Sequence, residues 1–428
     1  MKDLSLRDSK VIWHPYTQMK TAKDPIAIQR GEGAYLFDEN GNKYIDAISS
    51  WWVNTHGHAH PHIAEKVAVQ LNKLEHVIFA GFTHEPAVEL AERLLKILPQ
   101  NQKRVFYSDN GSTAVEVALK MAFQYWSNKG IKRNKIVSFN NAYHGDTFGA
   151  MSISERSIFT SPFSNYLFDV LKVEIPTQEN ELELIGNFSE LIEREDIAAF
   201  IFEPLVQGAA GMLMYSADIL DQMIKICRDN EILIIADEVF TGFGRTGKMF
   251  ASDHLRNKAD IFCLSKGLTG GTMPLGVTTA TEDVYEAFLS DDTNKTFFHG
   301  HSFTANPVAC SAALASLDIF DRVETWDNIK RICEKLIEMK EVLSSSPRVK
   351  EIRLTGTILA IEIQTGDETS YFNELRNFLF PFFISKGIIL RPLGNIIYLV
   401  PPYCISNSDL DYICDAIKSC LTQLDFNE

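Results

Sequence analysis

The sequence has no hydrophobic run long enough to cross a bilayer, and it has little positive charge. Its longest apolar patch, Phe378–Ile384, falls short of the roughly 18–20 residues that a membrane helix needs, and it contains a proline. The 41 lysine and arginine residues are outnumbered by 56 acidic ones. The resulting formal charge of −15 disfavours nucleic acid or an anionic membrane surface as a partner.

Paired cysteines, repeats and targeting segments are also missing. The seven cysteines are scattered and include no CxxC, which fits a reducing compartment and small buried side chains better than a disulfide framework. The first ten residues are polar and mixed in charge, without the apolar core of a secretory signal or the acid-poor character of a transit peptide. We therefore expect a cytoplasmic protein.

What the chain does have is an alternation of strand and helix signals through its middle. With 428 residues it can form two or three domains. Apolar runs predict strands at 135–139, 197–202, 232–236 and 259–264, with helices at 114–126 and about 219–228. Strands this apolar are covered on both faces, so the pattern predicts an α/β fold with a mostly parallel sheet.

The character of the chain changes after about residue 319. A charged helix is expected at about 325–344, followed by strands at 358–363 and 388–391 and a final helix from Asp409. Near the N-terminus, segments 33–38 and 43–46 predict a hairpin with an Asn-Gly turn, which we expect to pack with the C-terminal part. We predict a large domain at 50–320 and a smaller α+β domain built from 1–49 and 321–428.

Two charged residues stand where apolar strands end. Lys266 follows the strand at 259–264, and Asp237 follows the strand at 232–236. A lysine in such a buried place can lose water, lower its pKa and form a Schiff base with an aldehyde. Pyridoxal phosphate needs an amine for its aldehyde and an anion for its pyridinium nitrogen, and the pair offers both. Alternatively, both are surface residues at strand ends.

Two further segments have residues that could bind a phosphate group and stack on a cofactor ring. Gly111 and Ser112 open a helix whose first N–H groups would suit a phosphate, although plain N-capping by Ser112 or Thr113 explains the same residues. Tyr143 follows the strand at 135–139, where its ring can lie on a cofactor or simply pack in a turn. The glycine-rich loop after Asp237 adds Glu238 and Arg245 as ion-pairing candidates.

Histidines and tryptophans are concentrated before residue 63. His56, His58, His60 and His62 alternate as in a metal site, but Gly57 and Pro61 break a regular strand and no further ligands are near in sequence. We therefore expect solvated or turn-forming histidines and no metal. Trp51 and Trp52 fill core or interface space, or form the walls of a substrate pocket.

Together these motifs resemble the class III pyridoxal-phosphate-dependent aminotransferases over nearly the whole chain. The signature-like segments are Asp237–Gly247 and Ser265–Gly271. Within the class the chain is most similar to the branch that works in biotin synthesis. The segments that carry this finer likeness are Ile12–Thr17, Ser49–Trp52, Tyr143–Ser152, Gln207–Met212, Thr269–Met273, Arg391–Tyr398 and Pro401–Tyr403.

The resemblance implies a fold-type I transferase with pyridoxal 5′-phosphate and a role for each matching residue. Lys266 would be catalytic and hold the cofactor. The other cofactor-binding residues would be Gly111, Ser112, Tyr143, Asp237, His301 and Ser302. The substrate would be bound by Tyr16, Trp51, Trp52, Tyr143, Gly300 and Arg391. Gly300, His301 and Ser302 fall where the family reaches across the interface of a homodimer, with the active site at that interface.

The implied reaction is ping-pong transamination of 8-amino-7-oxononanoate to 7,8-diaminononanoate, with S-adenosylmethionine as amino donor. His301 and Ser302 replace a frequent Pro-Thr, Asn110 replaces a frequent serine, and Phe240 is variable. These departures bear on the identity of the amino donor more than on that of the acceptor, and lysine is the alternative to S-adenosylmethionine. Other readings are a class III enzyme for ornithine, 4-aminobutyrate or other ω-amines, an aminomutase or decarboxylase, and a regulator with an aminotransferase-like domain.

Overall fold

A seven-stranded sheet forms the centre of the structure. The computed structural model describes residues 4–177, 179–194, 196–366, 369–371 and 373–424. In spatial order the strands are β4 (Gln102–Ser108), β12 (Gly276–Thr281), β11 (Ile261–Leu264), β10 (Leu233–Asp237), β7 (Ile197–Phe202), β5 (Lys135–Phe139) and β6 (Leu171–Val173). Neighbours from β11 to β6 are parallel, and β12 is antiparallel to both its neighbours. The mostly parallel sheet predicted from the apolar runs is confirmed.

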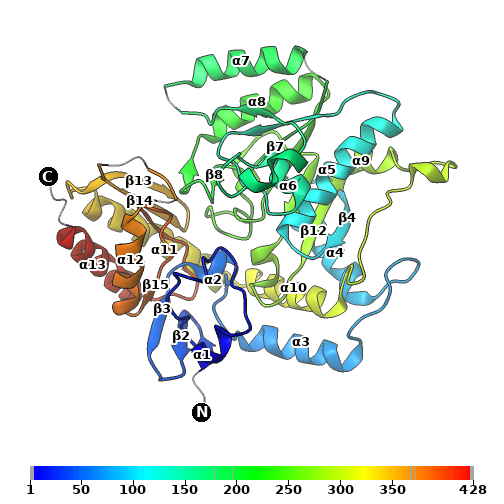
Figure 1. The fold of residues 1–428 in the computed structure, drawn as a ribbon. Helices are drawn as coiled ribbons and strands as arrows, with labels where there is room; N and C mark the ends of the chain where they lie inside the picture. The colour runs from blue at the N-terminus through cyan, green and yellow to red at the C-terminus, as the bar shows by residue number, and fades with distance from the viewer. Residues whose placement is uncertain (1–3, 178, 195, 367–368, 372, 425–428) are drawn as a thin grey trace.

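Helices cover both faces of this sheet because its strands are apolar on both sides (Figure 1). On β7, Phe200 packs in one buried cluster with residues of α8 (Ala217–Asp229), whereas the adjacent Ile201 packs in another with residues of α5 (Gly111–Asn128). Successive strand residues point to opposite faces, so one strand contributes to two core layers. This sandwiching fixes the carboxyl ends of the parallel strands at one edge.

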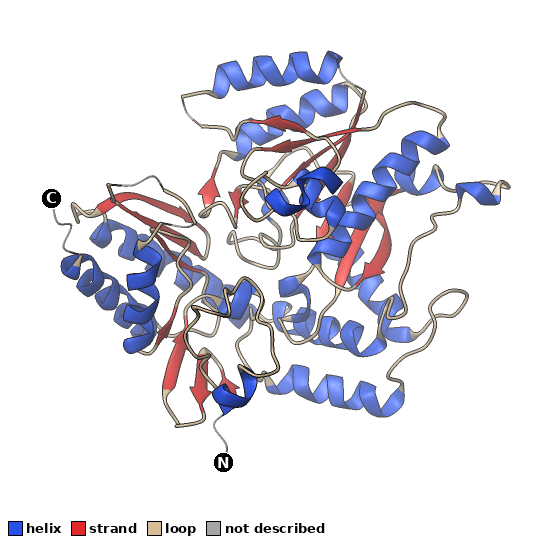
Figure 2. Cartoon of the chain, in the orientation of Figure 1, coloured by secondary structure: helices blue, strands red, loops and turns tan. Residues whose placement is uncertain are grey.

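The remaining helices surround the sheets (Figure 2). They are α1 (Leu4–Asp8), α2 (Ser49–Trp52), α3 (Pro61–Lys73), α4 (Glu85–Ile97), α6 (Phe148–Ile153), α7 (Glu181–Arg194), α9 (Glu282–Glu286), α10 (Pro307–Phe320), α11 (Val323–Leu343), α12 (Leu375–Ser385) and α13 (Asn407–Gln423). Short 3₁₀ turns occur at Ser161–Tyr166, Ala251–His254, Lys266–Thr269 and Thr293–Lys295. Within the described ranges, no helix combines the length and apolar character needed to cross a membrane.

The two ends of the chain meet in smaller sheets. One contains β1 (Ile28–Glu32), β2 (Tyr35–Asp38), β3 (Lys43–Asp46) and β15 (Ile388–Ile389), and another contains β13 (Val349–Thr355), β14 (Ile358–Ile363) and β16 (Ile396–Leu399). A further pair joins β8 (Val206–Gln207) and β9 (Leu213–Met214). Because β3 pairs in parallel with β15, the N-terminal hairpin packs with the C-terminal part as predicted (Figure 1).

Several predicted elements agree closely with the structure. The strands at 135–139, 197–202 and 358–363 and the hairpin of β2 and β3 are confirmed. The strand predicted at 388–391 is shorter, since it ends at Ile389 and Leu393 instead bridges to Ile396. Five of the seven cysteines are buried and all are free, as expected for small core residues. The domain boundaries at residues 50 and 320 stay a prediction.

Candidate active site

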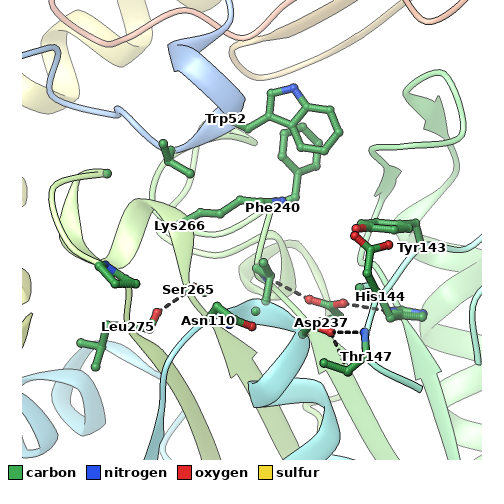
Figure 3. A pocket seen from close by; sticks show the side chains of 18 of the residues that line it. Trp52, Asn110, Tyr143, His144, Thr147, Asp237, Phe240, Ser265, Lys266 and Leu275 are labelled. Atoms are coloured by element: carbon green, nitrogen blue, oxygen red, sulfur yellow. Dashed lines mark hydrogen bonds and ion pairs between the residues drawn. The ribbon is translucent and has the colours of Figure 1, made fainter. Parts of the chain in front are cut away.

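A cavity of about 660 Å³ lies at the carboxyl ends of β10 and β11 (Figure 3). Its walls come from the segments that follow β4, β5, β7, β10 and β11 and from α2. The lining residues are Trp52, Val53, Asn110, Gly111, Ser112, Tyr143, His144, Gly145, Asp146, Thr147, Glu203, Asp237, Val239, Phe240, Ser265, Lys266 and Gly271 to Leu275. The carboxyl edge of a parallel sheet is a frequent place for ligands because the strand-end loops diverge there.

Lys266 projects into this cavity from the turn after β11. Its backbone φ is +46°, so the chain has left the extended conformation of β11 at this residue. The side chain keeps some accessible surface inside the cavity, but Nζ lies 4.7 Å from the ring centre of Trp52 and 5.5 Å from that of Phe240. Desolvation by this enclosure lowers the pKa of Lys266 to about 8, against the opposing effects of Asp237 and Glu203. The lowered pKa expected from the sequence is therefore present.

Asp237 ends β10, next to β11, and its carboxylate is held by two donors. His144 Nδ1 lies 2.7 Å from Oδ2, and the Val239 backbone N–H donates to Oδ1 at 3.0 Å. A carboxylate can only accept, so His144 carries its proton on Nδ1. Its buried Nε2 has no hydrogen-bond partner within the described part of the chain. The pair of strand-end residues predicted from the sequence does face one cavity.

Glu203 is a second carboxylate in the wall, and the sequence analysis missed it. It is buried, and its oxygens accept hydrogen bonds from the backbone N–H groups of Tyr143 and Gly208 at 3.1 and 3.0 Å. Burial raises the pKa of Glu203 to about 7. Its position directly after β7, which neighbours β10, is the same strand-end signal that identified Asp237, and it would have found Glu203 too.

Two glycines allow close packing around the start of α5. A Cβ on Gly111 would lie 2.5 Å from Val239 Cγ1, and one on Gly145 would lie 2.2 Å from Ser112 Oγ, where φ is also +128°. Ser112 Oγ in turn bonds Thr147 Oγ1 at 2.7 Å. Asn110 caps the helix, and its side chain accepts from the Thr113 N–H; the Thr113 hydroxyl completes the capping box by accepting from the Asn110 N–H, so capping involves Thr113 but not Ser112. Ser112 lines the cavity, and its hydroxyl also accepts from the Thr147 N–H at 3.1 Å.

A chain of aromatic side chains continues outward from the cavity. The hydroxyls of Tyr143 and Tyr16 are 3.4 Å apart, and Tyr16 donates to Asp146 Oδ2 at 2.5 Å. Desolvation, together with Asp146, raises the pKa of Tyr16 to about 12. Tyr16 meets Trp51 edge-on at 5.6 Å, and the guanidinium of Arg391 lies 4.7 Å from the Trp51 ring centre. These residues therefore connect Arg391 to the cavity.

Trp52 lies on the cavity side of this wall. Its ring packs 4.6 Å from that of Phe240 over the end of Lys266 (Figure 3). Of the two readings of the paired tryptophans, the structure places Trp52 in the cavity wall, while Trp51 is 39% exposed.

Gly300, His301 and Ser302 do not line the cavity among the residues described. His301 Nε2 lies 3.3 Å from Asp109 Oδ1, close to the start of α5. Glu238 accepts from Thr241 and from the N–H groups of Ala251 and Ser252, and Arg245 donates to the Pro401 carbonyl. Neither Glu238 nor Arg245 forms an ion pair in the described ranges.

Three of the four alternating histidines have hydrogen-bond partners of their own, so for these three the expectation of solvated side chains is wrong. His56 bonds Ser316 at 2.9 Å, His58 bonds Asp46 at 2.8 Å, and His62 bonds Asp318 at 2.8 Å. Only His56 lies in a turn in the sense predicted. In the part of the chain that the structure describes, no three His, Cys, Asp or Glu side chains gather as a metal site would require.

Comparison with known proteins gives a consistent family likeness. Residues 16–421 match the family Aminotransferase class-III. The adenosylmethionine-8-amino-7-oxononanoate aminotransferase of Synechococcus elongatus is 46% identical, over 96% of this chain and 99% of its own. The enzyme of the same name from Staphylococcus aureus is 38% identical, over 96% of this chain and 95% of its own.

Solved structures give the same result. The enzyme of that name from Methanocaldococcus jannaschii superposes with a TM-score of 0.94 at 38% identity, covering 99% of both chains. An omega transaminase from Pseudomonas jessenii, solved in complex with PMP, has a TM-score of 0.92 at 27% identity, covering 98% of both chains. These likenesses confirm the predicted fold class, that of a fold-type I PLP-dependent transferase.

Proposed function

Because this chain belongs to the class III aminotransferases, which depend on pyridoxal 5′-phosphate, we propose that it transfers an amino group to 8-amino-7-oxononanoate, giving 7,8-diaminononanoate for biotin synthesis. The observation that carries the proposal is the 46% identity, over almost the full length of both chains, to a relative named for that reaction. The omega transaminase is less similar, at 27% identity. An ω-amino acid substrate is therefore the second choice.

The cavity residues fit the cofactor. One wall offers an amine of lowered pKa, and the other offers the Asp237 carboxylate. Gly111 and Gly145 bring the backbone so close to Val239 and Ser112 that a Cβ would clash, at the start of a helix of 18 residues where N–H groups point outward. Such N–H groups bind phosphate well. The cofactor's ring, when bound, accepts the electrons of the carbanion formed at the substrate's α-carbon.

Lys266 would hold the cofactor and move protons. Its neutral Nζ would take up the proton released from the donor's α-carbon. A pKa of about 8 leaves a useful fraction of this amine neutral near pH 7. Asp237 would pair with the pyridinium nitrogen, with His144 holding its second oxygen in place. In the second half-reaction Lys266 would move a proton in the reverse sense. The cycle would be ping-pong because the product of the donor leaves before the acceptor binds.

The aromatic wall would bind the substrates. Arg391 would take the acceptor's carboxylate in its planar fork, and stacking on Trp51 at 4.7 Å would hold the fork in orientation. Tyr16, Tyr143 and Trp52 would line the space between this guanidinium and Lys266, and Tyr143 would also lie against the cofactor ring. We propose S-adenosylmethionine as donor because the relatives' names contain it. Lysine is the alternative.

Gly300, His301 and Ser302 would act in the site of a second copy of the chain. They stand apart from the cavity of their own chain, and the nearby Phe298 and Phe303 are 72% and 61% exposed. Exposed aromatic side chains of this kind favour an interface. We therefore propose a homodimer in which Ser302 and His301 reach the partner's phosphate site. The cytoplasmic location expected from the sequence remains part of the proposal.

The test is an assay of the purified protein with pyridoxal 5′-phosphate and 8-amino-7-oxononanoate, with S-adenosylmethionine or lysine as donor. The proposal expects 7,8-diaminononanoate from one of the donors, and no turnover from Lys266→Ala. Mixing the yellow protein with each donor alone shows which one discharges the colour. Failure with both donors, together with turnover of 4-aminobutyrate or ornithine, would overturn the proposed acceptor and favour an ω-amino acid aminotransferase.

A further inference from the structure

The segment that carries the two tryptophans has an unusual backbone. Ser49, Ser50 and Trp52 have φ values of 52°, 60° and 67°, and Ser50 combines its positive φ with a ψ of −96°. Side chains of L-residues rarely adopt positive φ, so such a backbone persists only where surrounding contacts hold it. Three such residues within four positions require a specific restraint on α2.

The restraint comes from a carboxylate beneath the segment. Asp46 is fully buried, and its oxygens accept from the Ile48 N–H at 3.1 Å and from the Ser50 N–H at 2.7 Å. His58 Nε2 lies 2.8 Å from the oxygen that serves Ser50. Since a carboxylate only accepts, His58 donates this bond and fixes the direction of the carboxylate. Ser49 Oγ adds a bond to the Val400 carbonyl at 2.7 Å.

His58 is well suited to this role because its backbone is anchored independently. Its N–H donates to the Gly33 carbonyl at 2.8 Å, and its own carbonyl accepts from the Gly33 N–H at 3.2 Å. A Cβ on Gly31 would lie 2.6 Å from His58 Cβ, so the two backbones are close. The imidazole can therefore be replaced while the bridge that fixes its Cα remains.

The segment that Asp46 holds lies between the Arg391 side and the Lys266 side of the proposed site. On one side Trp51 stacks on Arg391 at 4.7 Å, and on the other Trp52 lies 4.7 Å from Lys266 Nζ. Any rotation of the backbone at Ser50 therefore moves the support of Arg391 and the cover of Lys266 together. Neither Asp46 nor His58 lines the cavity itself.

We propose that Asp46 and His58 are positioning residues for the active site, which hold the strained segment so that Trp51 orients Arg391 toward the acceptor's carboxylate. The role in binding the acceptor rests on the proposed function, whereas the role in holding the backbone does not. The motif of alternating histidines thus contains one residue with a part in the site.

A matched pair of amides tests the proposal. Gln at position 58 can place its amide nitrogen where His58 Nε2 lies, whereas Asn is too short to reach Asp46. His58→Asn is expected to raise the KM for 8-amino-7-oxononanoate about tenfold, as loss of a charge-assisted hydrogen bond would, with a smaller change in kcat. His58→Gln is expected to restore KM to within about threefold of the unchanged protein. His62→Asn, which breaks the equivalent bond to Asp318, is the control and leaves KM unchanged.

A double-mutant cycle shows whether His58 acts through Trp51. In a Trp51→Ala background, His58→Asn is expected to raise KM by much less than tenfold, because the ring that it positions is absent. Additive effects of the two changes, or an equal rise in KM from His62→Asn, would overturn the proposal. A fall in kcat at unchanged KM, matched by an equal fall in cofactor content, would also overturn it, because that is the mark of a general loss of folded protein.

Amide hydrogen exchange gives a readout that needs no substrate. The peptide covering residues 47–54 contains the N–H groups of Ile48 and Ser50, so it is expected to exchange faster in His58→Asn but not in His58→Gln or His62→Asn. Unchanged exchange in His58→Asn would overturn the inference even if the enzyme is active. If the unchanged protein makes no product, the proposed function fails, and exchange of this peptide still decides whether His58 holds the segment.

Discussion

Removal of the indole that covers Lys266 should return the pKa of that lysine toward its ordinary value. Desolvation lowers this pKa from 10.5 to about 8, and Trp52, which is 6% exposed, contributes one wall of the enclosure. In Trp52→Ala, water reaches Nζ and stabilises its charged form. The neutral fraction of the amine, which alone can react with an aldehyde, then falls.

The size of the effect follows from the two pKa values. At pH 7 a pKa of about 8 leaves roughly 9% of the amine neutral, and a pKa of 10.5 leaves roughly 0.03%. Full return to the ordinary value would therefore slow covalent capture of pyridoxal 5′-phosphate about 300-fold at pH 7, and each single unit would slow it about tenfold. Because Phe240 still covers the other side at 5.5 Å, we expect a shift of about one unit.

In the assay, cofactor-free protein is mixed rapidly with pyridoxal 5′-phosphate at pH values between 6 and 9. The rate at which the yellow absorbance appears measures covalent capture of the cofactor. The ratio of the two proteins' rates cancels the titration of the cofactor itself. The midpoint of capture is expected near pH 8 in the unchanged protein and higher in Trp52→Ala. Trp13→Ala, which removes an indole that is 88% exposed, is the control. An unchanged midpoint in Trp52→Ala would refute desolvation by Trp52 as the cause.

Three further changes test other parts of the site. Arg391→Ala should raise the KM for the acceptor about 10- to 100-fold and the KM for the donor much less. Arg391→Lys should give an acceptor KM between those of the unchanged protein and Arg391→Ala. Equal effects on both substrates would contradict the placement of the carboxylate. Gly145→Ala should weaken cofactor binding, measured by titration, about 10- to 100-fold because its Cβ would meet Ser112 Oγ at 2.2 Å. Gly130→Ala, at a positive φ with nothing within 4 Å, is its control. Burial raises the pKa of Glu203 from 4.5 to about 7, so its contribution to stability is present below pH 4.5 and is lost as pH rises through 7. In urea unfolding, the free energy of unfolding of Glu203→Gln should therefore rise relative to that of the unchanged protein by up to about 3 kcal/mol between pH 5 and pH 8. A difference between the two proteins that does not change with pH would show that the pKa of Glu203 is not raised.

The sequence predicted those parts of the fold and site that depend on local pattern. Strands such as β5 and β7 are mostly apolar runs next to polar residues, so the extent of each run located their ends. Lys266 and Asp237 could be paired from sequence because each follows such a run, and neighbouring parallel strands end at one edge. Glu203 carries the same signal and was overlooked.

Other features depend on contacts between distant segments and have no local signal. His144 and Asp237 are 93 positions apart, and nothing near either residue indicates their bond. The partners of the alternating histidines lie on α10 and β3, so their spacing alone suggested exposed side chains. The short β15 was overestimated because the chain leaves the sheet after Ile389, although Leu390 and Leu393 remain buried as strand residues would be.

The central claim is that Lys266 holds the cofactor opposite Asp237. Reduction of the pyridoxal 5′-phosphate-loaded protein with borohydride, followed by peptide mapping by mass spectrometry, tests it directly. The account predicts one pyridoxyl group per chain, on Lys266. A label on another lysine, or a protein that stays colourless and unlabelled after incubation with the cofactor, would contradict it.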